Sequence, residues 1–201
     1  MQNTGSVNSK ERPILFNAEM VNAILSGRKT QTRRIMRDQP EVIPPEDECG
    51  VPGYWIPYNA GKTMVRNEMM TIACPLGKPG DQLWVRETFG DCGVRLVYRA
   101  DYDDGAACIV KRWTPSIHMP RWASRINLLI TGVRVERLND ISEQDARAEG
   151  IKAWRGPAEE LVGGKLAFFE LWDSIYGQKE GENWQANPWV WVIEFERMEA
   201  K

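Results

Sequence analysis

The sequence predicts an α+β fold built around a curved sheet or a small β-barrel with flanking helices. Strand-like and helix-like segments are mixed along the chain, the helices are few, and no regular strand–helix alternation indicates a parallel sheet. With 201 residues, of which 42% are hydrophobic and 27% charged, the chain is expected to form a single domain over residues 12–198. Residues 1–11 are polar and are expected to form a flexible tail.

The N-terminal third contains one short strand, one helix and an insertion. Residues 13–16 form an apolar strand, and residues 18–26 follow as a helix that Asn17 caps and a glycine ends. Residues 38–80 are rich in proline, glycine and acidic residues. This composition predicts an insertion or flap beside the domain, with a hairpin near residues 54–71.

The rest of the chain supplies most of the sheet. Strands are expected at residues 82–87, 94–100, 126–138 and 189–196, and Gly132 is a possible bulge in the third of them.

Two further helices are expected between the last two strands. Ser142 and Asp145 stand in capping register at the start of a helix that Gly150 closes. A longer helix is predicted over residues 157–176 and ends before a glycine.

Composition excludes several classes of protein. No run of about 18 apolar residues is present, and the N-terminus lacks the apolar core of a signal peptide, so we expect a cytoplasmic protein without membrane contact. The four cysteines are widely spaced and predict free thiols, with no metal and no cofactor. Residues 1–37 carry seven basic and two acidic side chains, and residues 111–137 carry six and one. Two basic blocks in an acidic chain favour a local anionic partner, although an unevenly charged surface gives the same pattern.

The single histidine, His118, cannot supply a Ser-His-Asp triad by itself, so any chemistry must use other side chains. Residues 27–34, GRKTQTRR, concentrate cations and hydroxyls directly after the first helix. Lys29 and Thr32 can share a face only if the chain turns between them. The alternative is a helix end whose cations simply complement the helix dipole.

If the two side chains meet, Lys29 is a candidate general base. Burial and the neighbouring arginines would lower the pKa of its amine, which could then take the proton of the Thr32 hydroxyl and activate it as a nucleophile. Glu87, at the end of a predicted strand, is the candidate third member. The alternative for Glu87 is a structural ion pair at the strand end.

The motif Gly27-x-Lys29-x-x-Thr32-x-Arg34 resembles the G-x-K-x-x-[ET]-x-R motif of the ASCH domain, a relative of the PUA fold. Further segments are similar to phage and prophage members of that family: PGDQLWVRETF at 79–89, MPRWASRI at 119–126, LWDSIYG at 171–177 and NPWVW at 187–191. The ordered set covers residues 13–37 and 79–196.

The resemblance implies a PUA-like barrel with a cleft lined by the motif. It also implies amidohydrolase activity on N(4)-acetylcytidine or a related modified nucleoside, with Lys29 as base, Thr32 as nucleophile and Glu87 as the carboxylate. The expected substrate-binding residues are Arg34, Trp84, Arg86, Phe89, Arg121 and Trp122. The alternatives are a non-catalytic module that binds single-stranded RNA, a ribonuclease that uses the same lysine, and a phage accessory part. The sequence leaves the oligomeric state open.

Overall fold

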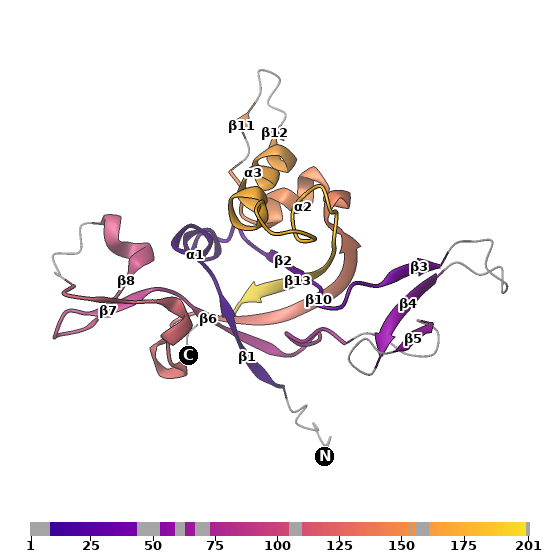
Figure 1. Ribbon diagram of the computed structural model, residues 1–201. Helices are drawn as coiled ribbons and strands as arrows, with labels where there is room; N and C mark the ends of the chain where they lie inside the picture. The colour runs from indigo at the N-terminus through magenta and orange to yellow at the C-terminus, as the bar shows by residue number, and fades with distance from the viewer. Residues whose placement is uncertain are drawn as a thin grey trace, which may run out of the picture.

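The computed structural model describes residues 9–43, 53–58, 63–66, 73–104, 110–152, 154–155 and 161–199. Within these ranges the chain is a mixed α+β protein (Figure 1). Its central sheet has five strands in the spatial order β1 (Glu11–Leu15), β6 (Gln82–Arg86), β10 (Asn127–Arg137), β13 (Trp189–Arg197) and β2 (Gln31–Ile35).

The central sheet is open rather than closed into a barrel. β1 and β6 are parallel, the other neighbours are antiparallel, and β1 and β2 form the two edges among the described strands. The expected closed barrel is therefore not found. The chain leading into β2 pairs instead with the end of the second helix, since Lys29 bridges Glu149 and the Thr30 amide donates to the Ala148 carbonyl at 2.8 Å.

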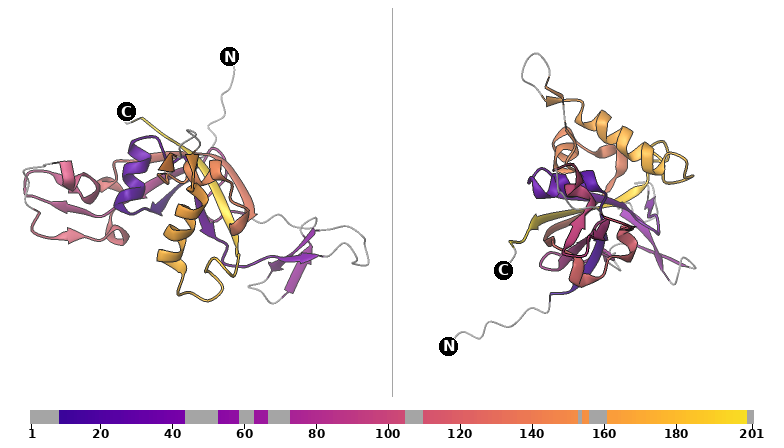
Figure 2. Two further views of the ribbon diagram at one scale, coloured as in Figure 1. Left: turned by 90° about the horizontal axis from the view of Figure 1, so that it is seen from above. Right: turned by 90° about the vertical axis from the view of Figure 1, so that its left-hand side faces the viewer.

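Three α-helices cover the sheet: α1 (Ala18–Leu25), α2 (Glu143–Ala148) and α3 (Gly164–Tyr176). Val21 and Ile24 of α1 belong to the main core on one face of the sheet. Ala146 of α2 and Phe168 of α3 pack on the other face, where Val192 contributes to a second core. Both views place α1 and α3 side by side (Figures 1 and 2).

Capping signals place the first two helices as expected. The Asn17 side chain accepts from the Met20 amide at 2.8 Å, and the Ser142 hydroxyl accepts from the Asp145 amide at 3.0 Å. These bonds satisfy amides that a helix start leaves without a partner.

The third helix begins later than predicted. Within the expected first turns, Leu161–Val162 form the short strand β12, which pairs with β11 (Trp154–Arg155), just before the expected start of the helix. The Glu143 carboxylate of α2 then accepts from the Gly164 amide at 2.9 Å and from the Lys165 amide at 3.2 Å. A side chain distant in sequence therefore fixes this helix start.

Two small antiparallel sheets complete the described strands. One joins β3 (Glu41–Ile43), β4 (Gly53–Tyr58) and β5 (Thr63–Arg66), so the hairpin expected within residues 38–80 is present as β4 and β5. The other joins β7 (Phe89–Asp91), β8 (Leu96–Tyr98) and β9 (Trp113–Thr114). Short 3-10 helices lie at Arg99–Asp104, Ser116–His118, Arg121–Ala123 and Leu138–Asp140.

Several local expectations are tested directly. The register of β10 shifts between Ile130 and Gly132, which confirms the predicted bulge.

The expectation of four free thiols is wrong, because Cys92 is disulfide-bonded, whereas Cys74 is free. Of the predicted tail, residues 1–8 lie outside the described ranges, and Glu11 already belongs to β1. No helix in the described ranges is both long enough and apolar enough to cross a bilayer.

Candidate functional site

Lys29 lies at the turn between α1 and β2 and is almost completely buried, with 3% of its surface exposed. Its ammonium donates to the Glu149 carbonyl oxygen at 2.9 Å and to Glu149 Oε2 at 2.8 Å. Both bonds come from the C-terminal end of α2. The candidate base is therefore held by a carboxylate 120 positions later in the chain.

Thr32 and Arg34 follow on one face of β2. Thr32 is buried, and its Oγ1 accepts from Arg34 Nη1 at 3.2 Å. The Arg34 guanidinium carbon and Lys29 Nζ lie 5.3 and 5.5 Å from the centroid of the same Phe16 ring. The chain thus turns between Lys29 and β2, and the motif's side chains gather around one aromatic ring.

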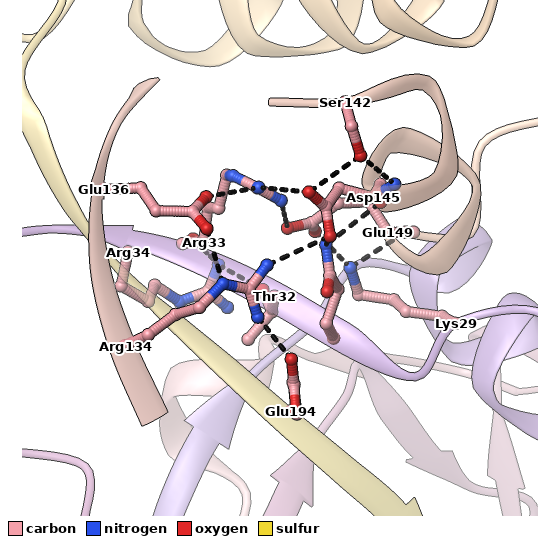
Figure 3. A network of polar contacts seen from close by, with 11 residues as sticks. Lys29, Thr32, Arg33, Arg34, Arg134, Glu136, Ser142, Asp145, Glu149 and Glu194 are labelled. Atoms are coloured by element: carbon pink, nitrogen blue, oxygen red, sulfur yellow. Dashed lines mark hydrogen bonds and ion pairs between the residues drawn. The ribbon is translucent and has the colours of Figure 1, made fainter. Parts of the chain in front are cut away.

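Arg33 points to the opposite face of β2 and is buried. Its guanidinium contacts Glu149 Oε1 at 3.2 Å, Glu136 at 2.9 Å and Asp145 at 3.5 Å. Figure 3 shows how Arg134 extends this network from β10. Because Glu149 bonds Lys29 through one oxygen and Arg33 through the other, its carboxylate is fixed in two directions.

Burial and the neighbouring charges shift the pKa of Lys29 in opposite directions. Burial is the largest effect and lowers the pKa below its ordinary value, because a buried ammonium loses its hydration. The Glu149 carboxylate raises the pKa through its charge and its hydrogen bond, whereas the charges of Arg34 and Arg33 lower it further. The net direction is downward, which favours proton exchange nearer to neutral pH than an exposed lysine allows.

A small cavity of about 40 Å³ opens at this point. Its polar lining consists of Thr32, Arg33 and Arg34 of β2 and Glu149 at the end of α2, and residues of α1 and α3 complete it: Met20, Phe168, Leu171, Trp172, Ile175 and Tyr176. A threonine, two arginines and a glutamate therefore line one small, partly open cavity whose other walls are mostly apolar and aromatic. Such a mixture of apolar walls and a few convergent polar groups is typical of a small-molecule site.

Glu87 does not pair with Lys29. It is buried at the end of β6 and forms a two-bond ion pair with Arg125, from Nε at 2.9 Å and from Nη2 at 3.1 Å. Arg125 also bonds Asp101 at 2.6 Å. Burial raises the pKa of Glu87, and Arg125 opposes this. No hydrogen bond or ion pair joins Glu87 to Lys29 among the described residues; Glu149 is the carboxylate that bonds Lys29, and the role of Glu87 stays a prediction.

The expected binding residues other than Arg34 lie elsewhere. Phe89 is buried and packs with Met119 and Ala123. Trp84 and Arg86 alternate along β6 with the buried Leu83 and Val85, so they face away from the main core. Arg86 and Arg121 lie 5.6 and 5.8 Å from the Trp84 ring, and Trp122 is 73% exposed. Trp84, Arg86, Arg121 and Trp122 form an outer surface, which we call the Trp84 surface. None of these four residues lines the cavity beside Thr32, which we call the Thr32 cavity.

Glu149 is the residue that sequence reasoning missed. The only local signal was its position beside Gly150, which was expected to close a helix. Nothing local relates it to the lysine, because the contact depends on how α2 docks on β2. In the described part of the chain, no group of three or more His, Cys, Asp or Glu side chains is placed to hold a metal ion.

No protein-family model matches the chain, and no curated protein matches it in sequence. Two solved structures are similar at low identity. One is a protein from Enterococcus faecalis V583 described under the family DUF984, with a TM-score of 0.42, 12% identity, and coverage of 94% of this chain and 80% of that chain. The other is an ASCH domain from Lactobacillus crispatus JV V101, with a TM-score of 0.40, 14% identity, and coverage of 94% and 79%. Similarity at this level assigns neither family nor activity to this chain.

Proposed function

We propose that this protein hydrolyses the amide bond that joins a short acyl group to the N4 amine of a cytidine or a related modified nucleoside. One observation carries the proposal: Thr32 and Glu149 line one small cavity, and the buried Lys29 ammonium is bonded to the Glu149 carboxylate. The resemblance of the motif around Lys29 to the ASCH motif supports the substrate class.

In the proposed reaction, Thr32 Oγ1 attacks the amide carbon, and its proton passes to the Lys29–Glu149 pair. Arg34, whose Nη1 lies 3.2 Å from Oγ1, stabilises the negative charge that develops on the carbonyl oxygen of the substrate. The carbon–nitrogen bond then breaks, and the pair returns the proton to the leaving amine. Water then attacks the resulting threonyl ester, and the pair accepts a proton from that water. The pair returns this proton to Thr32 Oγ1 as the ester carbon–oxygen bond breaks, which releases the carboxylic acid and restores the free enzyme.

The size of the cavity limits the acyl group. A single water needs roughly 10–15 Å³ of such volume, whereas the cavity provides about 40 Å³. It therefore holds a few non-hydrogen atoms, such as those of an acetyl group, and the nucleoside must remain outside it. Long acyl chains are expected to be poor substrates.

The test is hydrolysis of N(4)-acetylcytidine by the full chain and by three variants. Thr32→Ala should lower the rate roughly a thousandfold or more, because covalent catalysis is lost. Thr32→Ser should retain part of the rate, since a hydroxyl remains. The matched control is Thr30→Ala, which removes an exposed hydroxyl two positions earlier and should leave the rate unchanged.

Two results would overturn the proposal. One is a wild-type protein that fails to hydrolyse N(4)-acylcytidines of any short acyl length. The other is a Thr32→Ala variant that is correctly folded and keeps the wild-type rate. Circular dichroism of each variant separates loss of chemistry from loss of fold.

A second candidate function is binding of single-stranded RNA at the Trp84 surface. Aromatic rings beside arginines stack unpaired bases and attract phosphates; here Arg121 lies over the Trp84 ring, and the next residue, Trp122, is exposed. Trp122→Ala should then weaken binding of a short RNA roughly tenfold, in line with the loss of one stacked base. Hydrolysis of a free nucleoside should not change.

A further inference from the structure

A second, larger pocket of about 360 Å³ opens beside the Thr32 cavity, in the groove between α1 and α3. Residues from both helices and from the two turns that flank the site line it: Glu19, Asn22, Arg28, Gly150, Ile151, Lys152, Ala167 and Leu171. Its volume falls within the range of small-molecule sites.

The two cavities are neighbours. Leu171 lines both of them. We call the larger one the outer pocket and the Thr32 cavity the inner cavity. Glu19 and Gly150 line the outer pocket, and the residues next to them in sequence, Met20 and Glu149, line the inner cavity. The two cavities therefore lie next to each other, on either side of Leu171.

The outer pocket carries a fixed cation. Arg28 Nη1 donates to the Gly150 carbonyl at 2.8 Å, and its Nε donates to the Ser26 hydroxyl at 3.1 Å. These bonds hold the guanidinium in place, while Nη2 forms no bond within the described residues. Lys152 adds a second exposed cation, and Glu19 is the one acidic side chain in the lining. Two cations against one carboxylate favour an anionic group in this pocket.

We propose that the outer pocket binds the phosphate of a phosphorylated nucleoside, with Arg28 and Lys152 as the phosphate-binding residues. The inference rests on the proposed function, which places the acyl group in the inner cavity and the nucleoside outside it. The substrate class then becomes a nucleoside monophosphate or the phosphorylated terminal nucleotide of an RNA, which present the same chemistry. Arginine suits this role because its planar guanidinium can form two bonds to one phosphate.

The experiment is calorimetric titration of the full chain with cytidine and with cytidine 5′-monophosphate. Wild type should bind the monophosphate at least tenfold more tightly than cytidine, since charge-assisted bonds are each worth roughly that factor. Arg28→Gln should remove most of this preference and leave the affinity for cytidine unchanged. The matched control is Arg95→Gln, an exposed arginine in the turn between β7 and β8, which should keep the preference.

A second variant guards against a disturbed fold, because Arg28 also holds the Gly150 carbonyl. Lys152→Gln should weaken binding of the monophosphate at least threefold and leave cytidine unaffected. Equal affinity of wild type for the two ligands, or an unchanged preference in both variants, would overturn the phosphate site. If a 5′-phosphorylated trinucleotide binds as tightly as the monophosphate, the ligand is an RNA end. If the trinucleotide binds much more weakly than the monophosphate, the ligand is the free nucleotide.

Hydrolysis separates the failure of this inference from the failure of the proposed function. Equal rates on N(4)-acetylcytidine and its 5′-monophosphate, at subsaturating concentration, would refute the phosphate site and leave the hydrolase in place. Absence of hydrolysis, together with a monophosphate preference that Arg28→Gln removes, would refute the hydrolase and leave the phosphate site in place.

Discussion

Gly150 is the point at which the end of α2 approaches the turn after α1, and replacing it with alanine tests the packing of the site. Its φ is +91°, and a Cβ built there would lie 2.7 Å from the Ala23 Cβ and 2.9 Å from the Lys29 Cβ. Neither neighbour is the far end of a flexible side chain, so α1 and α2 must move apart. The adjacent Glu149 carboxylate would move with α2.

The expected cost has two parts. An L-residue with a left-handed backbone costs about 1–2 kcal/mol. Forcing an extra methyl into a packed contact adds about 1–3 kcal/mol. Gly27, which follows α1 with φ +73°, is a matched control, because an added Cβ there has nothing within 4 Å. Gly27→Ala should therefore cost only the backbone part.

Urea unfolding followed by circular dichroism measures the difference between the two variants. Gly150→Ala should lower the free energy of unfolding by about 2–5 kcal/mol and Gly27→Ala by about 1–2 kcal/mol. Equal losses in the two variants would refute the close approach of α2 to Lys29. A Gly150→Ala variant as stable as the wild type would refute the left-handed geometry as well.

Two further predictions concern the charged groups. Glu149→Gln should lower the free energy of unfolding by about 3–5 kcal/mol, because it leaves the buried Lys29 ammonium without its carboxylate. The control, Glu11→Gln, breaks an exposed pair with Arg121 and should lower it by less than about 1 kcal/mol. Urea unfolding that gives similar losses for the two variants would contradict this prediction. Asp81 accepts from the Lys10 amide, and this bond is the largest cause that lowers the pKa of the carboxyl. Because the pKa of Asp81 is lower in the folded state, its charged form stabilises the fold at any pH above the ordinary pKa of aspartic acid, and this stabilisation disappears as pH falls through the folded pKa. Asp81→Asn should therefore be less stable than wild type at pH 7, and the two free energies of unfolding should converge in acid. A stability difference that does not change with pH would contradict the role given to Asp81.

Elements with local signals were predictable from the sequence. Asn17 and Ser142 cap helices because their side chains bond amides three residues away, and such bonds depend only on neighbouring residues. Gly132 indicated a bulge because glycine within a strand-like segment is typical of one, although the register shift itself lies in the pairing of β10 with β13. The motif of Lys29, Thr32 and Arg34 was also recognisable, because its residues lie within one turn and the strand that follows.

Contacts between distant segments could not be predicted. Lys29 pairs with Glu149 and Glu87 pairs with Arg125 because α2 docks beside β2 and the segment before β10 passes β6. Both carboxylates lie at the ends of elements, so the sequence offered no physical basis for choosing between them. The open sheet has the same origin, since the end of α2 takes the position of a closing strand beside the start of β2.

The strand order also determines when the site can exist during synthesis. Among the described strands β2 pairs only with β13, so a nascent chain that has emerged as far as α3 carries the Thr32 motif on a strand without a partner. The Ile193 backbone that pairs with Thr32 is translated long after the motif. A ribosome-bound intermediate therefore contains the residues of the site but not the site itself, and removal of β13 should eliminate ligand binding even though every lining residue remains in the chain.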